Sequence, residues 1–420
     1  MKRIAIFIDG TWNRPDAENP TNVLRLARCV KHFDRETDTP QYVIYSPGVG
    51  AGRGNTRLAR RMDRLFGGSL GWGLLDIIEE TYRNLVFAYE PGDELYIFGF
   101  SRGAFAARSL VGLIRSCGIA PRAHMARIPE ALRRYVSRDP KGHPEDPESY
   151  LFRADFAPLT ATSDSEYIWR RKRGDSEAIR LTIDYLGVWD TVGALGLPGF
   201  VPGAARFNAQ YRFHDTNLSS SVLAARHAVA LDERRATFPP SLWSNLDELN
   251  TRRADRPVPA YQQQWFPGDH GSVGGGGSRV GLSSIAMNWI AQGAEKAGLS
   301  LNWEDFDRQA PQLDLRERLT NKFGPVGLSG WLLNAMTQDR DGPARLDDLS
   351  VVALDRFRTD ADYRPAALGA VYHTLFNLSD DAWGEARGRL IARDGGLTHA
   401  LDGRARPRPI GQIRRARRRG

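Results

Sequence analysis

Residues 94–108 read E-L-Y-I-F-G-F-S-R-G-A-F-A-A-R, and this stretch decides the fold. Its first part, Leu95 to Phe98, is continuously apolar, as expected for a strand that is buried on both faces of a parallel sheet. Small and apolar residues follow directly and predict a helix from Arg102 to about Ser116. A buried strand that runs into a helix is the repeating unit of an α/β fold.

The turn between this strand and helix reads G-F-S-R-G at 99–103, a G-x-S-x-G pattern. Such a turn is typical of a nucleophile elbow, in which a serine is exposed on a sharp bend between strand and helix. The two glycines permit the tight bend, and the helix N-terminus favours negative charge that develops beside the serine. We therefore predict that Ser101 is a catalytic nucleophile. The alternative is a tight turn with a solvated serine.

Strands and helices alternate on both sides of this unit. Strands are expected at 3–8, 41–46, 181–188 and 261–266, and helices near 22–32, 72–89 and 283–297. The alternation predicts an α/β domain over residues 1–300, with a mostly parallel central sheet flanked by helices. The polar, proline-containing region 120–178 is expected to be an insertion over the sheet, and 301–400 a helical C-terminal extension or lid.

A serine hydroxyl needs a base, and the partners on such a sheet follow in the order Ser, Asp or Glu, His. Asp190 in L-G-V-W-D-T-V-G ends an apolar strand, where the active-site edge of a parallel sheet should lie, and is the predicted acid. Its alternative role is an N-cap. Asp184 lies in mid-strand and is the weaker candidate.

His270 in F-P-G-D-H-G-S-V-G lies in a glycine-rich loop just after the strand at 261–266 and is the preferred base. His227 in A-R-H-A-V-A-L-D-E-R-R is the second choice, because its segment is predicted to be helical and a lone helical histidine is more often structural. Asp269 is either a partner of His270 or only a loop residue.

An oxyanion hole needs two backbone N–H groups aimed at one point. We expect one from Arg102, after the nucleophile, and the other from Gly10 or Thr11, after the first strand. No H-E-x-x-H motif and no His/Cys cluster with zinc spacing occurs, so neither a metal nor a cofactor is expected. The aspartate-phosphatase signature D-x-D-G-T fails at Phe7, and the glycines at 48–54 fit no dinucleotide loop.

The formal net charge of +8 is concentrated at the end of the chain. Residues 404–420 contain eight arginines and no acid, so this tail accounts for the whole excess and the remainder is neutral. We expect the tail to be disordered and able to touch an anionic membrane surface. A solvated tail without function is the alternative, and nucleic-acid binding ranks below both.

The sequence contains no run of eighteen apolar residues, so it predicts no membrane-spanning helix. The start, M-K-R-I-A-I-F-I-D-G, has too short an apolar stretch for a signal peptide, and Asp9 stands where a cleavage site should come. These features predict a cytoplasmic chain. Cys29 and Cys117 make no disulfide framework and are expected to be small core residues.

Six short segments, taken in their order along the chain, resemble the motifs of one known protein family. They are D-G-T-W-N at 9–13, G-V-G-A-G at 48–52, G-F-S-R-G-A-F-A-A-R at 99–108, G-V-W-D-T-V-G-A-L-G at 187–196, H-A-V-A-L-D-E-R-R at 227–235 and F-P-G-D-H-G-S-V-G-G-G at 266–276. Together they resemble the α/β-hydrolase domain of phospholipase effectors of bacterial type VI secretion systems. The resemblance implies an α/β-hydrolase-like fold, action on phospholipid ester bonds, the triad Ser101, Asp190 and His270, and delivery by such a system.

The leading hypothesis is a serine esterase or lipase-type hydrolase that forms an acyl-enzyme on Ser101. One alternative is a peptidase or amidase with the same triad, and another is a non-enzymatic hydrolase-fold protein that binds a partner or a membrane. The apolar stretches Gly330–Leu333 and Ala367–Phe376 are candidates for a lid or an interfacial face, or they pack on the core.

Overall fold

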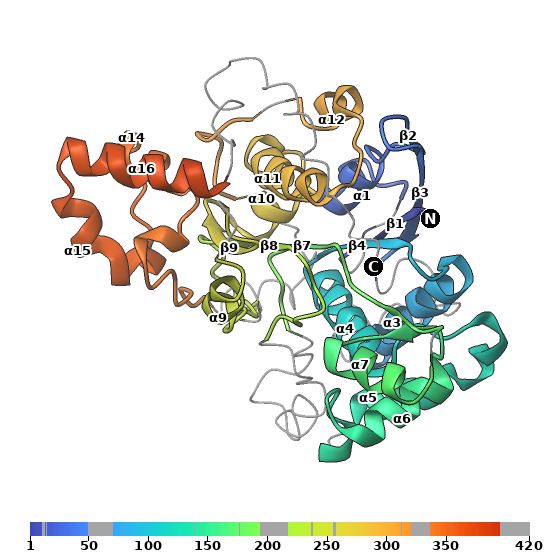
Figure 1. The fold of residues 1–420 in the computed structure, drawn as a ribbon. Helices are drawn as coiled ribbons and strands as arrows, with labels where there is room; N and C mark the ends of the chain where they lie inside the picture. The colour runs from blue at the N-terminus through green and yellow to red at the C-terminus, as the bar shows by residue number, and fades with distance from the viewer. Residues whose placement is uncertain are drawn as a thin grey trace.

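The computed structural model describes residues 1–10, 13, 15–48, 70–137, 139–175, 177–193, 217–236, 238–254, 258–311, 313–320 and 337–394. These residues form a seven-stranded sheet in the order β2-β3-β1-β4-β7-β8-β9, with helices on both faces (Figure 1). The strands are β1 Arg3–Ile8, β2 Phe33–Asp34, β3 Thr39–Ser46, β4 Glu94–Phe100, β7 Tyr185–Trp189, β8 Ala225–Ala230 and β9 Tyr261–Phe266. All neighbours are parallel except β2 and β3. The predicted α/β class with a mostly parallel sheet is confirmed.

Alternate residues of the central strands feed two cores. Ala5 and Phe7 belong to the core under α1 (Asn22–Ala27) and α11 (Gly281–Ala297). Ile4, Ile6 and Ile8 belong to the core under α3 (Leu70–Ala88) and α4 (Arg102–Cys117). Figure 1 looks along the sheet, with α1 and α11 above it and α3 and α4 below. Because both faces are covered, the strands are apolar throughout rather than alternating.

The chain changes direction across the sheet at β1. It passes from β1 to β3 on one side and then returns to β4 on the other. Connections that leave two adjacent strands in opposite directions open a crevice at the carboxyl ends of those strands. Ile8 pairs with Gly99 at this edge, so the segments that carry Gly10 and Ser101 leave the sheet side by side.

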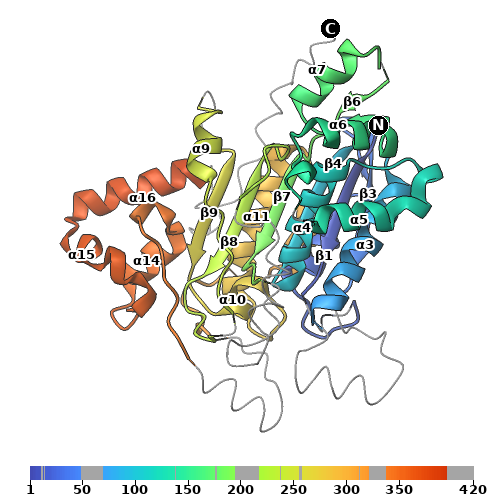
Figure 2. The same ribbon diagram turned by 90° about the horizontal axis from the view of Figure 1, so that it is seen from below.

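The predicted insertion at 120–178 is a further helical layer outside α4 (Figure 2). Its elements are η1 Arg122–Arg127, α5 Ile128–Val136, η2 Pro140–Gly142, α6 Pro147–Phe156, β5 Thr160–Ala161 and α7 Asp164–Lys172, and β5 pairs with β6 Ile179–Arg180 just after it. Inside it, the buried carboxylate of Glu166 pairs with Arg153 and Arg170, each at 2.8 Å. The insertion therefore packs on α4 rather than on the sheet itself, and its interior contains buried ion pairs among its own residues.

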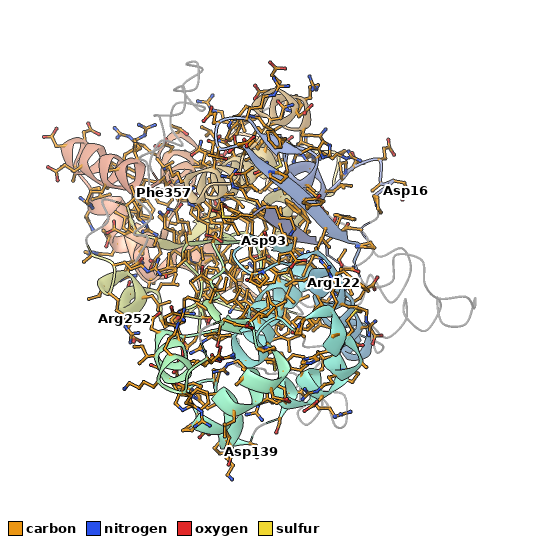
Figure 3. All side chains as sticks on the ribbon, turned by 45° about the vertical axis from the view of Figure 1, so that its right-hand side comes forward. Asp16, Asp93, Arg122, Asp139, Arg252 and Phe357 are labelled. Atoms are coloured by element: carbon orange, nitrogen blue, oxygen red, sulfur yellow. The ribbon has the colours of Figure 1, made fainter. Side chains whose placement is uncertain are left out.

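The C-terminal part of the described chain is helical: its last helices lie beside β9 at the end of the sheet (Figure 2), whereas Trp303–Gln309 packs against α1. Its elements are α12 Trp303–Gln309, η3 Leu346–Asp348, α14 Val351–Thr359, η4 Ala366–Leu368, α15 Gly369–Asn377 and α16 Asp380–Asp394; α9 Leu246–Thr251 lies earlier in the chain. Leu349 forms a parallel bridge with Trp265 of β9. Figure 3 shows Phe357 of this region far from Asp139 of the insertion, so the two flank different parts of the sheet.

The two apolar stretches considered as a lid differ in what the structure describes. Gly330–Leu333 lies outside the described residues. In Ala367–Phe376, Leu368, Val371 and Leu375 are buried, and Phe376 is the one large apolar side chain of this described stretch that is mostly exposed. Most of the apolar surface of this stretch is therefore covered by the protein itself.

The predicted helix around His227 is wrong, because residues 225–230 form strand β8. All six are buried, so A-R-H-A-V-A shows no alternation, and short buried runs cannot be assigned to helix or strand by periodicity. The helix expected at 22–32 ends at Ala27. Cys29 and Cys117 are buried and free, as expected. In the described ranges no helix is both long and apolar enough to cross a membrane.

At Gly103 the backbone of α4 passes close to the end of β1. A Cβ added at Gly103 would lie 2.3 Å from the carbonyl oxygen of Ile8. We expect Gly103→Ala to lower the free energy of unfolding by about 1–3 kcal/mol, because backbone atoms must move apart. Urea denaturation measures this change.

The matched control is Gly388→Ala in α16, where an added Cβ meets no atom within 4 Å. This change should raise stability by up to about 1 kcal/mol, since alanine is the better helix former. Equal stability of the two variants would contradict the close approach at Gly103.

Candidate active site

Ser101 occupies the turn between β4 and α4 in a strained conformation. Its φ and ψ are 59° and −125°, a region that residues with a Cβ rarely adopt. Three described non-glycine residues have positive φ, and the other two are Asp190, at 35°, and Asp38. Such strain concentrates at functional sites, where the surrounding structure must hold it. Two of the three strained residues are thus the predicted nucleophile and acid.

Gly99 in the turn and Gly10 in the loop after β1 lie in close packing around the serine. A Cβ at Gly99 would lie 2.4 Å from the carbonyl oxygen of Gly103, and one at Gly10 would lie 3.3 Å from the Cβ of Ser101. The Ser101 N–H donates to the Trp189 carbonyl oxygen at 3.1 Å, just before Asp190. The elbow is therefore clamped between the ends of β1 and β7.

The carboxylate of Asp190 is fully buried at the end of β7. Its Oδ1 accepts the Ala230 N–H at 2.9 Å, and its Oδ2 contacts Nδ1 of His270 at 2.5 Å. Arg340 donates to both oxygens, from Nη1 to Oδ1 at 2.7 Å and from Nη2 to Oδ2 at 3.0 Å. Burial alone would raise the pKa of Asp190, but the charge of Arg340 and the hydrogen bonds hold that pKa well below its usual value. The group is an anion at neutral pH.

His270 begins the short helix α10 (His270–Gly274), which follows β9. Its ring lies between Phe100, with ring centroids 4.5 Å apart, and Phe238, at 4.9 Å. Since Phe100 directly precedes Ser101, the imidazole lies against the neighbour of the predicted nucleophile. Asp269 caps α10 by accepting the Ser272 N–H at 2.9 Å, so it fixes the helix that carries His270.

Glu233 supports the same helix from the loop after β8. Its Oε2 accepts a hydrogen bond from the backbone N–H of His270 at 3.2 Å. Both of its oxygens also bind the side chain of Arg235. Burial would raise the pKa of Glu233, but the hydrogen bonds and charge of Arg235 lower it to about 2. Sequence reasoning quoted D-E-R-R at 232–235 for its resemblance but assigned it no role.

Arg340 was also missed by sequence reasoning. It lies in the polar run T-Q-D-R-D-G at 337–342, where an arginine is expected to be solvated. The structure buries its guanidinium against Asp190 and the carbonyl oxygens of Ala230 and Phe238, both at 2.7 Å. No local pattern marks such a residue, because all of its partners are distant in sequence.

Both ring nitrogens of His227, the second-choice base, are bound by residues outside the predicted triad. Its Nδ1 contacts Oε1 of Gln263 at 3.0 Å, and its Nε2 accepts the Thr191 N–H at 3.2 Å. Burial and the charge of Arg108 lower the pKa of His227 to about 3, so the ring is neutral. Its contacts hold the turn after Asp190. The weaker acid, Asp184, accepts the Leu95 N–H where β4 begins, at the opposite edge of the sheet.

The loop after β1 is organised by Asp9, which accepts hydrogen bonds from the hydroxyls of Thr21 and Tyr45, each at 2.8 Å. It also accepts the Gly10 N–H at 2.7 Å. The expected oxyanion donor Gly10 is thus engaged by Asp9, and Thr11 lies outside the described residues. Arg102, the other expected donor, is the first residue of α4, where N–H groups have no acceptor within the helix.

Comparisons with known proteins connect this site to a family. The model of the catalytic domain of Tle1-like type VI secretion phospholipase effectors matches residues 2–293. An uncharacterized protein of Saccharomyces cerevisiae is 28% identical over 244 residues, which cover 56% of this chain and 32% of the yeast protein.

Two solved structures are similar at low identity. A crystal structure of an uncharacterized protein from Pseudomonas aeruginosa has 19% identity and a TM-score of 0.38, covering 97% of this chain and 64% of that one. The Tle1 effector bound to the VgrG spike of the type VI secretion system has 17% identity and a TM-score of 0.32, covering 65% and 52%. This chain therefore spans 32% to 64% of the length of these three proteins.

The family match contains Ser101, Asp190 and His270, together with the glycines that shape the elbow. On this match, the chain belongs to the family of Tle1-like phospholipase effectors of type VI secretion systems, through their catalytic domain.

Proposed function

We propose that this chain is a serine hydrolase of the α/β-hydrolase type that cleaves carboxylic ester bonds of phospholipids or related lipids. One observation carries the proposal: the buried Asp190–His270 contact of 2.5 Å lies at the sheet edge where Ser101 occupies its strained turn. Membership in a family of phospholipase effectors supports the lipid substrate.

The roles follow from the chemistry of the three side chains. Nδ1 of His270 donates to Asp190, which leaves Nε2 to accept the proton of the Ser101 hydroxyl as Oγ attacks the ester carbonyl. The imidazolium then gives this proton to the departing alcohol, and an acyl-enzyme on Oγ remains. Water, deprotonated by the same histidine, releases the fatty acid and restores the serine. Because Asp190 is held as an anion, it stabilises the imidazolium in both steps.

The oxyanion that forms during attack needs fixed N–H donors. We assign one to Arg102 at the N-terminus of α4, where the helix dipole also favours negative charge. The second would come from the loop after β1, whose Gly10 packs against the Cβ of Ser101. Asp9 holds that loop through Thr21 and Tyr45 and keeps it close to the serine.

Delivery and membrane contact form part of the same proposal. The family comprises effectors of type VI secretion systems, which supports delivery of this chain by such a system. The eight arginines of residues 404–420 would favour contact with anionic lipid at the target membrane.

An activated serine is tested with a fluorophosphonate probe on the purified chain. Wild type should be labelled and Ser101→Ala should not, because the probe reacts with the nucleophile. His270→Ala should slow labelling by roughly 10²- to 10⁴-fold, the usual contribution of a general base. The readout is the rate of covalent labelling on a gel.

The matched control is His227→Gln, which removes a buried histidine whose ring nitrogens bind Gln263 and Thr191, and keeps a side chain able to accept a hydrogen bond. Its labelling rate should stay within a few-fold of wild type. If His227→Gln lost labelling and His270→Ala kept it, the assigned base would be wrong. A folded wild type without labelling, with lipid present, would favour the non-enzymatic binding protein.

The substrate class is tested with vesicles of phosphatidylethanolamine and phosphatidylglycerol beside peptide and amide substrates. Fatty acid and lysophospholipid should appear with wild type and not with Ser101→Ala, as measured by mass spectrometry. Release of amine from the peptides without ester hydrolysis would instead support the peptidase or amidase.

A further inference from the structure

We propose that Arg340 is a positioning residue of this site: it holds Asp190 and, through the shared carboxylate, sets the pH range in which His270 acts as a base. The inference rests on the proposed function. It also assigns the C-terminal extension a part in the chemistry, because the family match ends at residue 293 and Arg340 lies beyond it.

The geometry is that of a bidentate pair. The two terminal nitrogens of Arg340 each contact one oxygen of Asp190, at 2.7 and 3.0 Å. Such fork-to-fork contacts fix the plane of a carboxylate as well as its position. Since Oδ2 contacts both Arg340 and His270, the plane of the carboxylate determines where the imidazole can lie.

Arg340 is itself held from two sides. The carbonyl oxygens of Ala230 and Phe238 accept from its terminal nitrogens, both at 2.7 Å. The preceding residues are bound to the loop after β8: the Gln338 N–H donates to the Arg234 carbonyl at 2.7 Å, and Thr337 bridges to Arg235. The guanidinium is therefore fixed before any substrate arrives, as positioning requires.

The same contact has an electrostatic consequence for His270. A carboxylate beside an imidazole stabilises the imidazolium, whereas a guanidinium on the same carboxylate opposes it. Both charges are buried, where solvent screens them weakly. Arg340 thus keeps the acid ionised while partly offsetting the attraction of that acid for the imidazolium.

The other charged groups around His270 are present in every variant compared below. Glu233 accepts the backbone N–H of His270 and forms an ion pair with Arg235. The negative charge of Glu233 and the positive charge of Arg235 therefore largely offset each other. Asp269 precedes the histidine and caps α10. A shift seen only when Arg340 is changed therefore reports on Arg340.

The experiment measures the rate of fluorophosphonate labelling of the full chain across pH for wild type, Arg340→Met and Arg340→Lys. Loss of the positive charge removes a repulsion and so stabilises the imidazolium. The acid limb of the profile should then move to higher pH by roughly one unit in Arg340→Met. Arg340→Lys keeps the charge and loses the fork, so its midpoint should stay near wild type while the plateau rate falls.

The control is Arg356→Met, which removes a buried arginine of the same extension that binds the carbonyl oxygens of Leu315 and Glu317. Its midpoint should equal that of wild type even if its melting temperature falls. An unmoved acid limb in folded Arg340→Met, or an unchanged plateau in Arg340→Lys, would overturn the inference and leave the proposed function standing.

If Arg340→Met does not fold, Arg340→Lys decides alone: a lowered plateau at an unmoved midpoint supports the inference, and a wild-type profile overturns it. Absence of labelling in folded wild type would overturn the proposed function and this inference with it.

Discussion

The buried carboxylate of Asp190 joins parts of the chain that are far apart in sequence. It receives the Ala230 N–H from the end of β8, the imidazole from the helix after β9 and the guanidinium from the C-terminal extension. Burial of an isolated carboxylate would be strongly unfavourable. Asp190 can therefore be buried at this end of the sheet only together with these partners. The position of the predicted base is thus a consequence of how one charge is compensated.

A second buried carboxylate at the same edge shows what Arg340 contributes. Asp9 directly follows β1 and accepts hydrogen bonds from Thr21, Tyr45 and Gly10, but none of these partners carries a positive charge. Burial raises the pKa of Asp9 to about 6 despite those hydrogen bonds. Asp190, with Arg340 beside it, stays ionised across the neutral range. The first residue suits the anchoring of a loop, and the second suits the stabilisation of an imidazolium.

The elbow depends on the sheet in a different way. Its backbone strain at Ser101 is held by the hydrogen bond to Trp189 and by the contacts of Gly99, Gly103 and Gly10. Each glycine fills a place where a Cβ would meet backbone or the serine itself. Because these contacts join the ends of β1, β4 and β7, the strained turn exists only when the parallel register of the three strands is complete.

The insertion and the extension relate differently to the site. The insertion packs outside α4 and balances its buried Glu166 with its own Arg153 and Arg170. The last helices of the extension lie beside β9, and the segment between α12 and these helices supplies Arg340 to the acid. Of these two additions to the sheet, the extension is the one whose described residues contact the predicted triad.

The sequence by itself determined the α/β class, the continuous apolar strands and the turn at Ser101, because these depend on local composition and on residues within a few positions of each other. It also pointed to Asp190 and His270, since strand ends followed by glycine are visible in the chain. It failed at His227, where a short run buried on all sides has no period that separates strand from helix. Only the tertiary structure decided that His270 meets Asp190 while His227 binds Gln263 and Thr191, and that Arg340 is buried. Those outcomes depend on the order and register of strands and on charge compensation between segments 80 to 150 residues apart, which no local pattern records.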